Sequence, residues 1–326
     1  MRISKPFLRT VLFCAILVLA VLFLNFLLVP YSSMMKRFRG FREDEKKGNI
    51  DLLVIGSSQE FDGFDAELMS EKLNMHCAVF APQGGNTETS YYCLVDAIGR
   101  NNIKTVIIGW DMLDNFEYPY NDYPSNRRAQ MYREMLADSQ NNPLLAKITW
   151  KNILEQRYTM TFFEYAAFPD NATQIKDVIQ SRKLKKQPWI QTENTSTTAM
   201  DETDLHNPRY ELDEVLARSY IAKVDDKKIL YAEKIRDVCA EKGIVLYFIS
   251  APYPKIVQET VKNFSEMKDE LKNIFEKIEI PLIDTYNETD FPNMTENSNY
   301  HDCNGHFIVS AKQIYTRSVC RWLKKS

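Results

Sequence analysis

The chain has 326 residues, of which 44% are hydrophobic and 26% are charged. This is the balance of a globular protein with a sizeable core, and it excludes a disordered chain. The formal net charge is −3 at pH 7, so the chain lacks the basic surplus typical of proteins that bind phosphate backbones. We therefore expect no nucleic-acid partner.

The first predicted element is a membrane-spanning helix. Residues 11–29, VLFCAILVLAVLFLNFLLV, contain Asn25 as their only strongly polar member, and a helix of this length crosses a hydrocarbon core roughly 30 Å thick. The alternative, a cleavable signal peptide, would be followed by small residues, whereas PYSSMMKRFRG follows here. Because long domains translocate largely regardless of flanking charge, we expect residues 1–10 in the cytoplasm and the rest of the chain outside it.

Residues 30–48 are predicted to be a juxtamembrane linker, and residues 49–326 a folded domain. Short apolar runs in this domain alternate with amphipathic stretches. The runs predicted as buried strands are residues 51–55, 77–81, 104–109, 244–250 and 280–284. Strand, helix and strand at this spacing predict a parallel sheet covered on both faces. Such sheets carry their chemistry in the loops at the carboxyl ends of the strands.

A stretch from about 115 to 218 interrupts this rhythm. It is rich in Asn, Gln, Tyr and charged residues, and it lacks a clear strand. We expect a helical insertion over the sheet, which would serve as a lid or as a docking surface.

The first strand runs directly into GSSQEF, residues 56–61. Gly56 permits a tight turn, and a serine at this end of a strand presents its hydroxyl beside free backbone N–H groups. Ser57 or Ser58 can therefore act as a nucleophile. The ordinary alternative is that both hydroxyls merely satisfy backbone groups in the turn.

The next two strands also end in polar loops. The second runs into APQGGNTETS, where Gly84 and Gly85 allow the backbone to offer an N–H to a developing oxyanion. The third runs into GWDMLDN, which carries Asp111 and Asn115 toward the same edge of the sheet.

The last loop, NYHDCNGHF, holds Asp302 between His301 and His306. A carboxylate near a histidine is the orienting half of a hydrolytic triad, so either histidine can belong to one. The three residues are also metal-ligand types, but we expect neither a metal nor another cofactor.

The six cysteines show no C-x-x-C spacing, which argues against a structural zinc site. Five lie outside the predicted span, and this odd number argues against a full disulfide framework. We expect free, mostly buried thiols, with Cys303 as an alternative nucleophile.

Taken in chain order, the serine turn, the glycine turn, the polar residue and the final Asp and His resemble the sequence blocks of the SGNH hydrolase superfamily. Within it, DLLVIGSSQEFDGFDAELMSEKL, GIVLYFISAPYP and YHDCNGHFIVSAKQIYT are similar to the membrane-anchored proteins of the DltD kind, whose nucleophile block also reads Gly-Ser-Ser. The resemblance implies a three-layer α/β/α, flavodoxin-like SGNH hydrolase fold with a central parallel sheet, preceded by one N-terminal transmembrane helix.

The resemblance also implies roles for single residues. Ser58 would be the nucleophile, with Ser57 as the alternative, and its backbone N–H would be one oxyanion donor. Gly85 would supply a second donor, with Gly84 as the alternative.

At the third donor position, this sequence has Asp111 where the family has asparagine. An ionised aspartate repels an oxyanion, so Asn86 or Asn115 would substitute, or the hole would have two donors. Asp111 itself is expected to hold a neighbouring loop or an arginine.

The family's last block is Asp-x-x-His, whereas one more residue separates Asp302 from His306. A loop containing Gly305 can accommodate this extra residue, while the adjacent side chains of His301 and Asp302 would point apart in an extended segment. We therefore expect Asp302 and His306 to complete the triad, with His301 as the alternative base.

By resemblance, the function is that of an extracytoplasmic serine esterase or O-acyltransferase. Its substrates would be D-alanyl or acetyl groups of a bacterial cell-surface glycopolymer, such as a teichoic acid or an exopolysaccharide. The suspected partner is a membrane-bound O-acyltransferase. The irregular Asp-to-His spacing and Asp111 favour the alternative, a non-catalytic scaffold or polymer-binding protein that assists such a partner.

Overall fold

The computed structural model describes residues 4–28, 33–82, 85–113, 178–180, 183, 195–217, 220 and 223–325. The chain forms two compact units. One contains residues 1–36 and 123–188, and the other contains residues 37–122 and 189–326.

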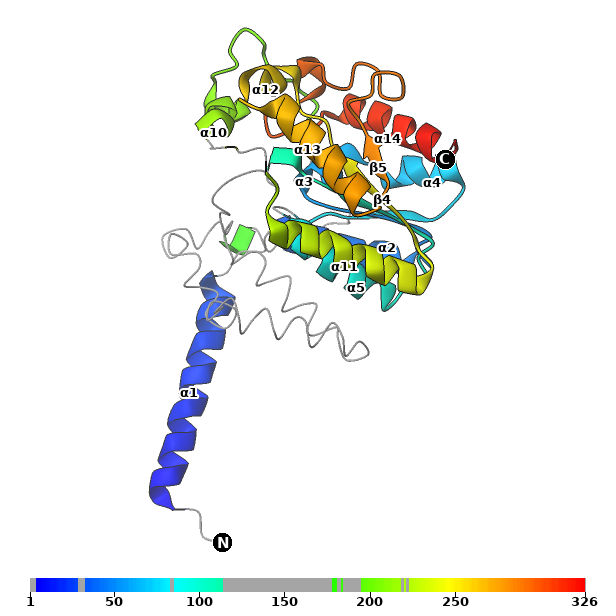
Figure 1. Ribbon diagram of the computed structural model, residues 1–326. Helices are drawn as coiled ribbons and strands as arrows, with labels where there is room; N and C mark the ends of the chain where they lie inside the picture. Colours follow the sequence, from blue (N-terminus) through cyan, green and yellow to red (C-terminus); the bar gives the residue numbers. More distant parts are fainter. Residues whose placement is uncertain are drawn as a thin grey trace. The chain divides into compact units, whose positions relative to one another are not determined.

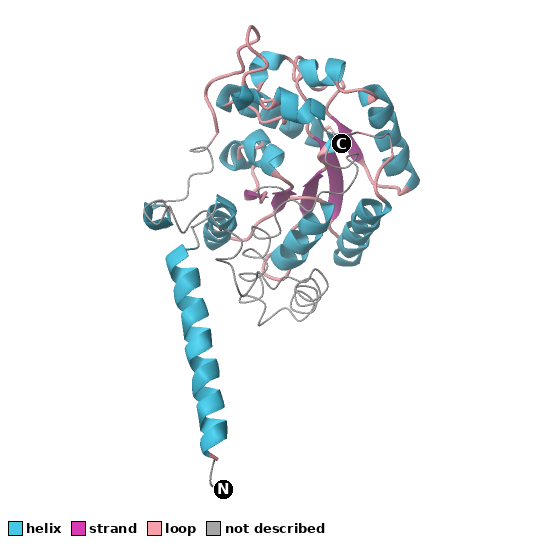
Figure 2. Cartoon of the chain, turned by 90° about the vertical axis from the view of Figure 1, so that its left-hand side faces the viewer, coloured by secondary structure: helices cyan, strands magenta, loops and turns pink. Residues whose placement is uncertain are grey.

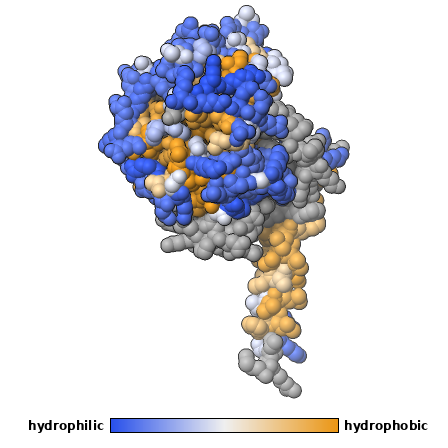
Figure 3. Space-filling model, turned by 90° about the vertical axis from the view of Figure 1, so that its right-hand side faces the viewer, coloured by the Kyte–Doolittle hydropathy of each residue, from blue (hydrophilic) through white to orange (hydrophobic). Residues whose placement is uncertain are grey.

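The described part of the first unit is dominated by helix α1, Lys5–Leu28. Its stretch Lys5–Leu24 is long and apolar enough to cross a membrane, because 20 residues of helix rise by about 30 Å. Figure 3 shows the apolar surface that its side chains present. The helix starts six residues before the apolar run from which it was predicted.

Helix α2, Ser33–Lys46, replaces the juxtamembrane linker that we expected. Phe38 and Phe41 are three residues apart and share one face of this helix, and both are buried against Phe80. The rings of Phe41 and Phe80 stack 4.2 Å apart. The many charges of this stretch suggested a solvated linker, but the burial of its two phenylalanines makes it part of the α/β domain.

The domain contains a five-stranded parallel sheet in the order β2-β1-β3-β4-β5. All five predicted strands are present. They are β1 Leu52–Ile55, β2 Cys77–Phe80, β3 Thr105–Gly109, β4 Val245–Ser250 and β5 Leu282–Asp284. Strands β1 and β2 are buried throughout, as expected of continuous apolar runs covered on both faces, whereas β4 begins exposed at Val245 and is buried from Phe248 on.

The helices of the domain follow the strands in regular alternation. After β1 come α3 Ser58–Gly63 and α4 Ala66–Leu73, and after β2 comes α5 Thr87–Ile98. Between β3 and β4 lie η7 Pro208–Tyr210, α10 Leu212–Ala217 and α11 Asp226–Lys242. Then come α12 Lys255–Thr260 and α13 Phe264–Lys277 before β5, with η8 Asn297–Asn299 and α14 Val309–Leu323 after it.

The strand order determines which faces the helices cover. The chain moves from β1 to β2 on one side, and then crosses back past β1 to β3. Because such crossovers are right-handed, their helices lie on opposite faces. Helices α5 and α11 pack together, as do α4 and α14, and Figures 1 and 2 show helices on both sides of the strands. The reversal at β1 makes its carboxyl end a topological switch point, where ligand sites of such sheets lie.

Candidate active site

The turn after β1 is the start of helix α3. Ser57 is its N-cap, whose hydroxyl accepts a hydrogen bond from the Gln59 backbone N–H, while the Glu60 carboxylate accepts one from the Ser57 backbone N–H at 2.6 Å. This reciprocal pair is a capping box. The Ser57 hydroxyl is therefore engaged in capping the helix. The hydroxyl of Ser58, the first helical residue, takes no part in the cap and is available for chemistry.

Glu60 lies in the core beneath this turn. It is only 1% exposed, and burial raises the pKa of its carboxyl, although hydrogen bonds from Ser57 act in the opposite direction. A Cβ atom at Gly56 or Gly109 would come within 2.2 Å of the Glu60 side chain. Gly56 is thus required for space around Glu60, and not for the unusual backbone angle that a tight turn suggested.

The loop that carries both histidines closes as a short hairpin. Tyr300 and Phe307 form an antiparallel bridge, and the His301 N–H donates to the His306 carbonyl at 3.1 Å. Gly305 adopts a φ of +82°, which side-chain-bearing residues rarely adopt. This hairpin folds the chain back on itself between Asp302 and His306.

The hairpin links three of the predicted site residues. His306 Nε2 lies 2.7 Å from Ser58 Oγ, and His306 Nδ1 lies 2.6 Å from Asp302 Oδ2. Asp302 Oδ1 also accepts hydrogen bonds from the backbone N–H groups of Asn304 and His306. These bonds fix the Asp302 carboxylate, and its hydrogen bond with Nδ1 fixes the orientation of the His306 imidazole. The additional residue between Asp302 and His306 is accommodated in the hairpin.

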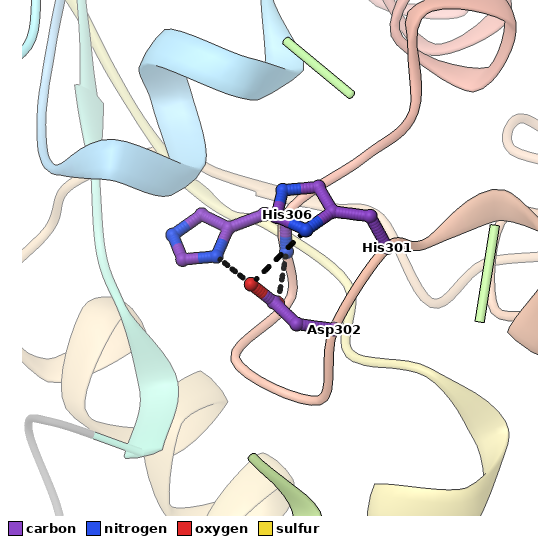
Figure 4. A group of neighbouring side chains, drawn as sticks. All are labelled: His301, Asp302 and His306. Atoms are coloured by element: carbon purple, nitrogen blue, oxygen red, sulfur yellow. Dashed lines mark hydrogen bonds and ion pairs between the residues drawn. The ribbon is translucent and has the colours of Figure 1, made fainter. Parts of the chain in front are cut away.

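His301 lies beside this chain of hydrogen bonds. Figure 4 shows both imidazoles next to the Asp302 carboxylate. His301 Nδ1 is 3.4 Å from Asp302 Oδ2, and the two rings are nearly parallel with centroids 5.5 Å apart. The three side chains each offer a metal-ligand atom, all within 4.8 Å of one another. In the described part of the chain, the hydrogen bond to Ser58 comes from His306 and not from His301.

His306 and Asp302 each stabilise the charged form of the other. Burial lowers the pKa of His306, but the charge of Asp302 and its hydrogen bond outweigh burial and raise this pKa to about 9. Burial raises the pKa of Asp302, but the charge and hydrogen bond of His306 outweigh it and bring this pKa below its ordinary value. Both shifts favour an ion pair of imidazolium and carboxylate.

Replacing Asp302 by asparagine is expected to move the pH dependence of Ser58 reactivity to lower pH. A protonated His306 cannot accept a proton, so labelling of Ser58 by a fluorophosphonate should rise with pH through about 9 in the unchanged chain. In the Asp302→Asn chain the neutral amide lacks the charge that raises this pKa, so the midpoint should fall. The maximal rate should also fall because the imidazole loses its orienting partner. The second-order labelling rate constant measured against pH tests this; an unchanged midpoint would contradict it.

The segment before α10 supports the hairpin. The sequence analysis did not predict this support. The Met200 N–H donates to the Tyr300 carbonyl at 2.8 Å, and the Cys303 N–H donates to the Tyr210 carbonyl at 2.8 Å. From the other side, Gln59 Nε2 donates to the Asn304 carbonyl at 2.8 Å. The described end of the predicted insertion therefore positions the His306 loop. Residues 114–177, on which the expected lid or docking role mainly falls, lie outside the described residues.

The predicted oxyanion donors have different environments. No acceptor for the Ser58 N–H occurs among the described residues, as expected at the start of a helix. The Gly85 N–H donates to the Pro82 carbonyl at 3.1 Å, and the Asn86 side-chain oxygen caps α5 by accepting from Thr89. A Cβ atom on Gly85 would lie 2.5 Å from the Gly56 carbonyl oxygen, so this loop abuts the serine turn.

Two of the alternative oxyanion donors, Gly84 and Asn115, lie outside the described residues. Asp111 accepts a hydrogen bond from the Tyr253 hydroxyl at 2.6 Å. It thus holds the loop after β4, as expected for a structural carboxylate.

The remaining histidines and the cysteines form no hydrogen bond with Ser58 among the described residues. His76 contacts the Asn49 carbonyl, and the exposed His206 contacts Asp213. All six cysteines are free, and the five outside α1 are buried, as predicted. Burial raises the pKa of Cys303 to about 12, which makes its thiol a poor nucleophile.

A cavity of about 310 Å³ lies at helices α4 and α14, away from this site. Its lining residues are Lys72, Ile314, Arg317, Cys320, Arg321 and Lys324. None of them contacts Ser58, Asp302 or His306 in the described structure.

Comparison with protein-family models finds no model that matches the chain, and comparison with curated proteins finds no matching relative. The site is therefore characterised by its geometry. It consists of a serine, a histidine and an aspartate joined by hydrogen bonds beyond the carboxyl end of the first strand of a parallel sheet.

Proposed function

We propose that the α/β domain is an SGNH-type serine esterase or O-acyltransferase. The observation that carries this proposal is the unbroken path of hydrogen bonds from Ser58 Oγ through the His306 imidazole to Asp302. The strand order β2-β1-β3-β4-β5, with helices on both faces, supports the three-layer fold that the resemblance implies.

In the proposed reaction, His306 accepts the proton of Ser58 as Oγ attacks the carbonyl carbon of an ester. Asp302 keeps Nδ1 protonated and stabilises the imidazolium that forms. The oxyanion accepts a hydrogen bond from the Ser58 backbone N–H at the start of α3. His306 then gives its proton to the departing alcohol oxygen, which leaves an acyl group on Ser58.

The acyl group is transferred in the second half of the reaction. A water molecule or a sugar or polyol hydroxyl gives its proton to His306 and attacks the acyl carbon, which frees Ser58. Water makes the protein an esterase, and another hydroxyl makes it a transferase. The same three residues serve both outcomes.

The surroundings of the site also favour catalysis over a scaffold role. The spacing between Asp302 and His306 differs from that of the family, but the hairpin brings both side chains into hydrogen-bond contact. Ser58 is half-buried rather than enclosed, which leaves access for a reagent. The Gly85 N–H is bonded to Pro82, so its use as a second oxyanion donor requires this turn to rearrange when substrate binds.

The substrate and location rest on the resemblance together with helix α1. We propose that α1 anchors the chain, with the α/β domain outside the cytoplasm, and that D-alanyl or acetyl esters of a cell-surface polymer are the substrates. A membrane-bound O-acyltransferase would supply the acyl group.

The test is the ester content of the envelope polymer in three strains. In a deletion strain we expect ester-linked acetate or D-alanine, released by mild alkali, to fall if the chain is a transferase and to rise if it is an esterase. The unchanged gene should restore the original content, and the Ser58→Ala gene should not. Restoration by Ser58→Ala would instead support the scaffold function, and unchanged ester content in the deletion strain would contradict the proposed substrate.

A further inference from the structure

A guanidinium group lies beside the helix that presents Ser58. Arg37, from α2, stacks its guanidinium on the ring of Phe61, with Cζ 3.8 Å from the ring centroid. Its Nη1 donates to the Ala81 carbonyl. Phe61 stands one helical turn after Ser58 in α3, and Ala81 follows β2 and precedes the loop of Gly85, so Arg37 contacts both the helix that presents Ser58 and the end of the neighbouring strand.

Most donors of this guanidinium have no partner among the described residues. An arginine has five N–H donors, and the described structure shows one hydrogen bond from Arg37, to a neutral carbonyl. No carboxylate in the described residues forms an ion pair with it within 4.0 Å. Arg37 is half-buried, so these donors are partly shielded from water, where a charge-assisted hydrogen bond is stronger.

A second cation, Lys312, also contacts Phe61. Lys312 is fully buried, and its Nζ donates to the Phe61 carbonyl at 2.8 Å and to the Thr195 hydroxyl at 3.3 Å. The buried carboxylate Asp62, whose charge acts on both Arg37 and Lys312, accepts a hydrogen bond from Thr195 at 3.1 Å. The charges of Asp62 and Asp65 both act on Lys312, whereas Arg37 responds to Asp62 without forming an ion pair with it in the described structure.

Arg37 and Lys312 both stay largely charged at neutral pH. Burial lowers the pKa of Arg37 to about 10, while the charge of Asp62 acts in the opposite direction. Burial likewise lowers the pKa of Lys312 to about 8. The charge of Arg37 also lowers the pKa of His306, which is consistent with its position at the site.

We propose that Arg37 is an anion subsite, which selects esters that carry a phosphate or carboxylate group close to the acyl group. The planar guanidinium fork matches the oxygens of both groups. This inference rests on the proposed function for the reaction at Ser58 and adds a charge requirement on the substrate. Arg37 would bind the alcohol portion while Ser58 attacks the acyl carbon.

The first experiment compares four acetyl esters that differ only in the group at the far end of an acetoxyethyl unit. They are 2-acetoxyethyl phosphate, 3-acetoxypropionate, neutral 2-acetoxyethanol and cationic acetylcholine. With the full-length chain in detergent, kcat/KM for acetate release should be at least about tenfold higher for an anionic ester than for the neutral one. The two anionic esters distinguish phosphate from carboxylate, and salt should weaken the preference.

Three variants assign this preference to Arg37. Arg37→Gln should abolish the preference, measured as the ratio of kcat/KM for the anionic ester to kcat/KM for 2-acetoxyethanol in the same variant, and Arg37→Lys should retain part of it. Lys46→Gln removes the same charge from an exposed position of the same helix, and it should leave the preference intact. Preference that survives in Arg37→Gln, or absence of any preference in the unchanged chain, overturns the proposal.

A binding measurement separates this proposal from the proposed catalytic function. In the Ser58→Ala chain, which cannot turn over, the phosphorus resonance of 2-hydroxyethyl phosphate should broaden on binding, and Arg37→Gln in the same chain should abolish the broadening. Broadening without hydrolysis of any ester by the unchanged chain would retain the subsite and reject the esterase. Hydrolysis without anion preference and without broadening would retain the esterase and reject the subsite.

Discussion

Replacing Ser58 by alanine is expected to abolish covalent labelling by a fluorophosphonate and to reduce ester hydrolysis by at least about a thousandfold, because no other group replaces the attacking oxygen. His306 Nε2 lies 2.7 Å from Ser58 Oγ, so the hydroxyl has a proton acceptor in contact. Mass spectrometry of the labelled full-length chain should find the adduct on Ser58. The helix should still form, since its cap is the neighbouring residue.

Ser57→Ala is the matched control for this experiment. It removes the same atom one residue earlier, where the hydroxyl accepts the Gln59 N–H as the helix cap. We expect labelling of Ser58 to persist, with a loss of about 1 kcal/mol in the free energy of unfolding. Labelling that survives in Ser58→Ala, or disappears from folded Ser57→Ala, would contradict the assignment of the nucleophile.

The second large effect distinguishes the two histidines of the hairpin. His306→Ala should reduce the rate constant for labelling by about a thousandfold or more, because Ser58 loses its proton acceptor. His301→Ala should change it by less than about tenfold, because His301 contacts Asp302 at 3.4 Å and makes no hydrogen bond to Ser58 in the described structure. A larger loss in His301→Ala would make His301 the base.

Removing His306 also leaves the 5%-exposed Asp302 without its charged partner, which can destabilise the domain. Free imidazole therefore provides a second measurement. It should partly restore labelling in a folded His306→Ala chain by entering the vacated space, and it should not increase labelling in Ser58→Ala. Rescue in His301→Ala but not in His306→Ala would favour the alternative assignment.

Local patterns were sufficient to predict much of the fold and several site residues. The buried strands appeared as short apolar runs because strands covered on both faces need no polar alternation. The strand pattern made the serine turn and the final loop candidates, and the resemblance to the SGNH superfamily then selected Ser58, Asp302 and His306. The capping box around Ser57 and Glu60 was also present as S-x-x-E, a signal that would have separated the two serines.

Other features depended on contacts between distant residues. Helix α2 looked like a charged linker, and only its packing against Phe80 in β2 showed that Phe38 and Phe41 are core residues. The position of Arg37 beside Phe61 followed from the same packing. Segment 195–211 gave no sign in its composition that it would support the hairpin.

The sequence by itself therefore determined the alternating α/β architecture, the apolar N-terminal helix and the residue types available for chemistry, because periodicity and turn residues are local properties. Only the tertiary structure decided between His301 and His306 as the partner of Ser58. The two histidines share one carboxylate, and the sequence favoured His306 with His301 as the alternative. A hairpin turn at Gly305 directs one imidazole toward Ser58, and the contacts that hold this hairpin join residues too far apart in the chain for a local pattern to encode.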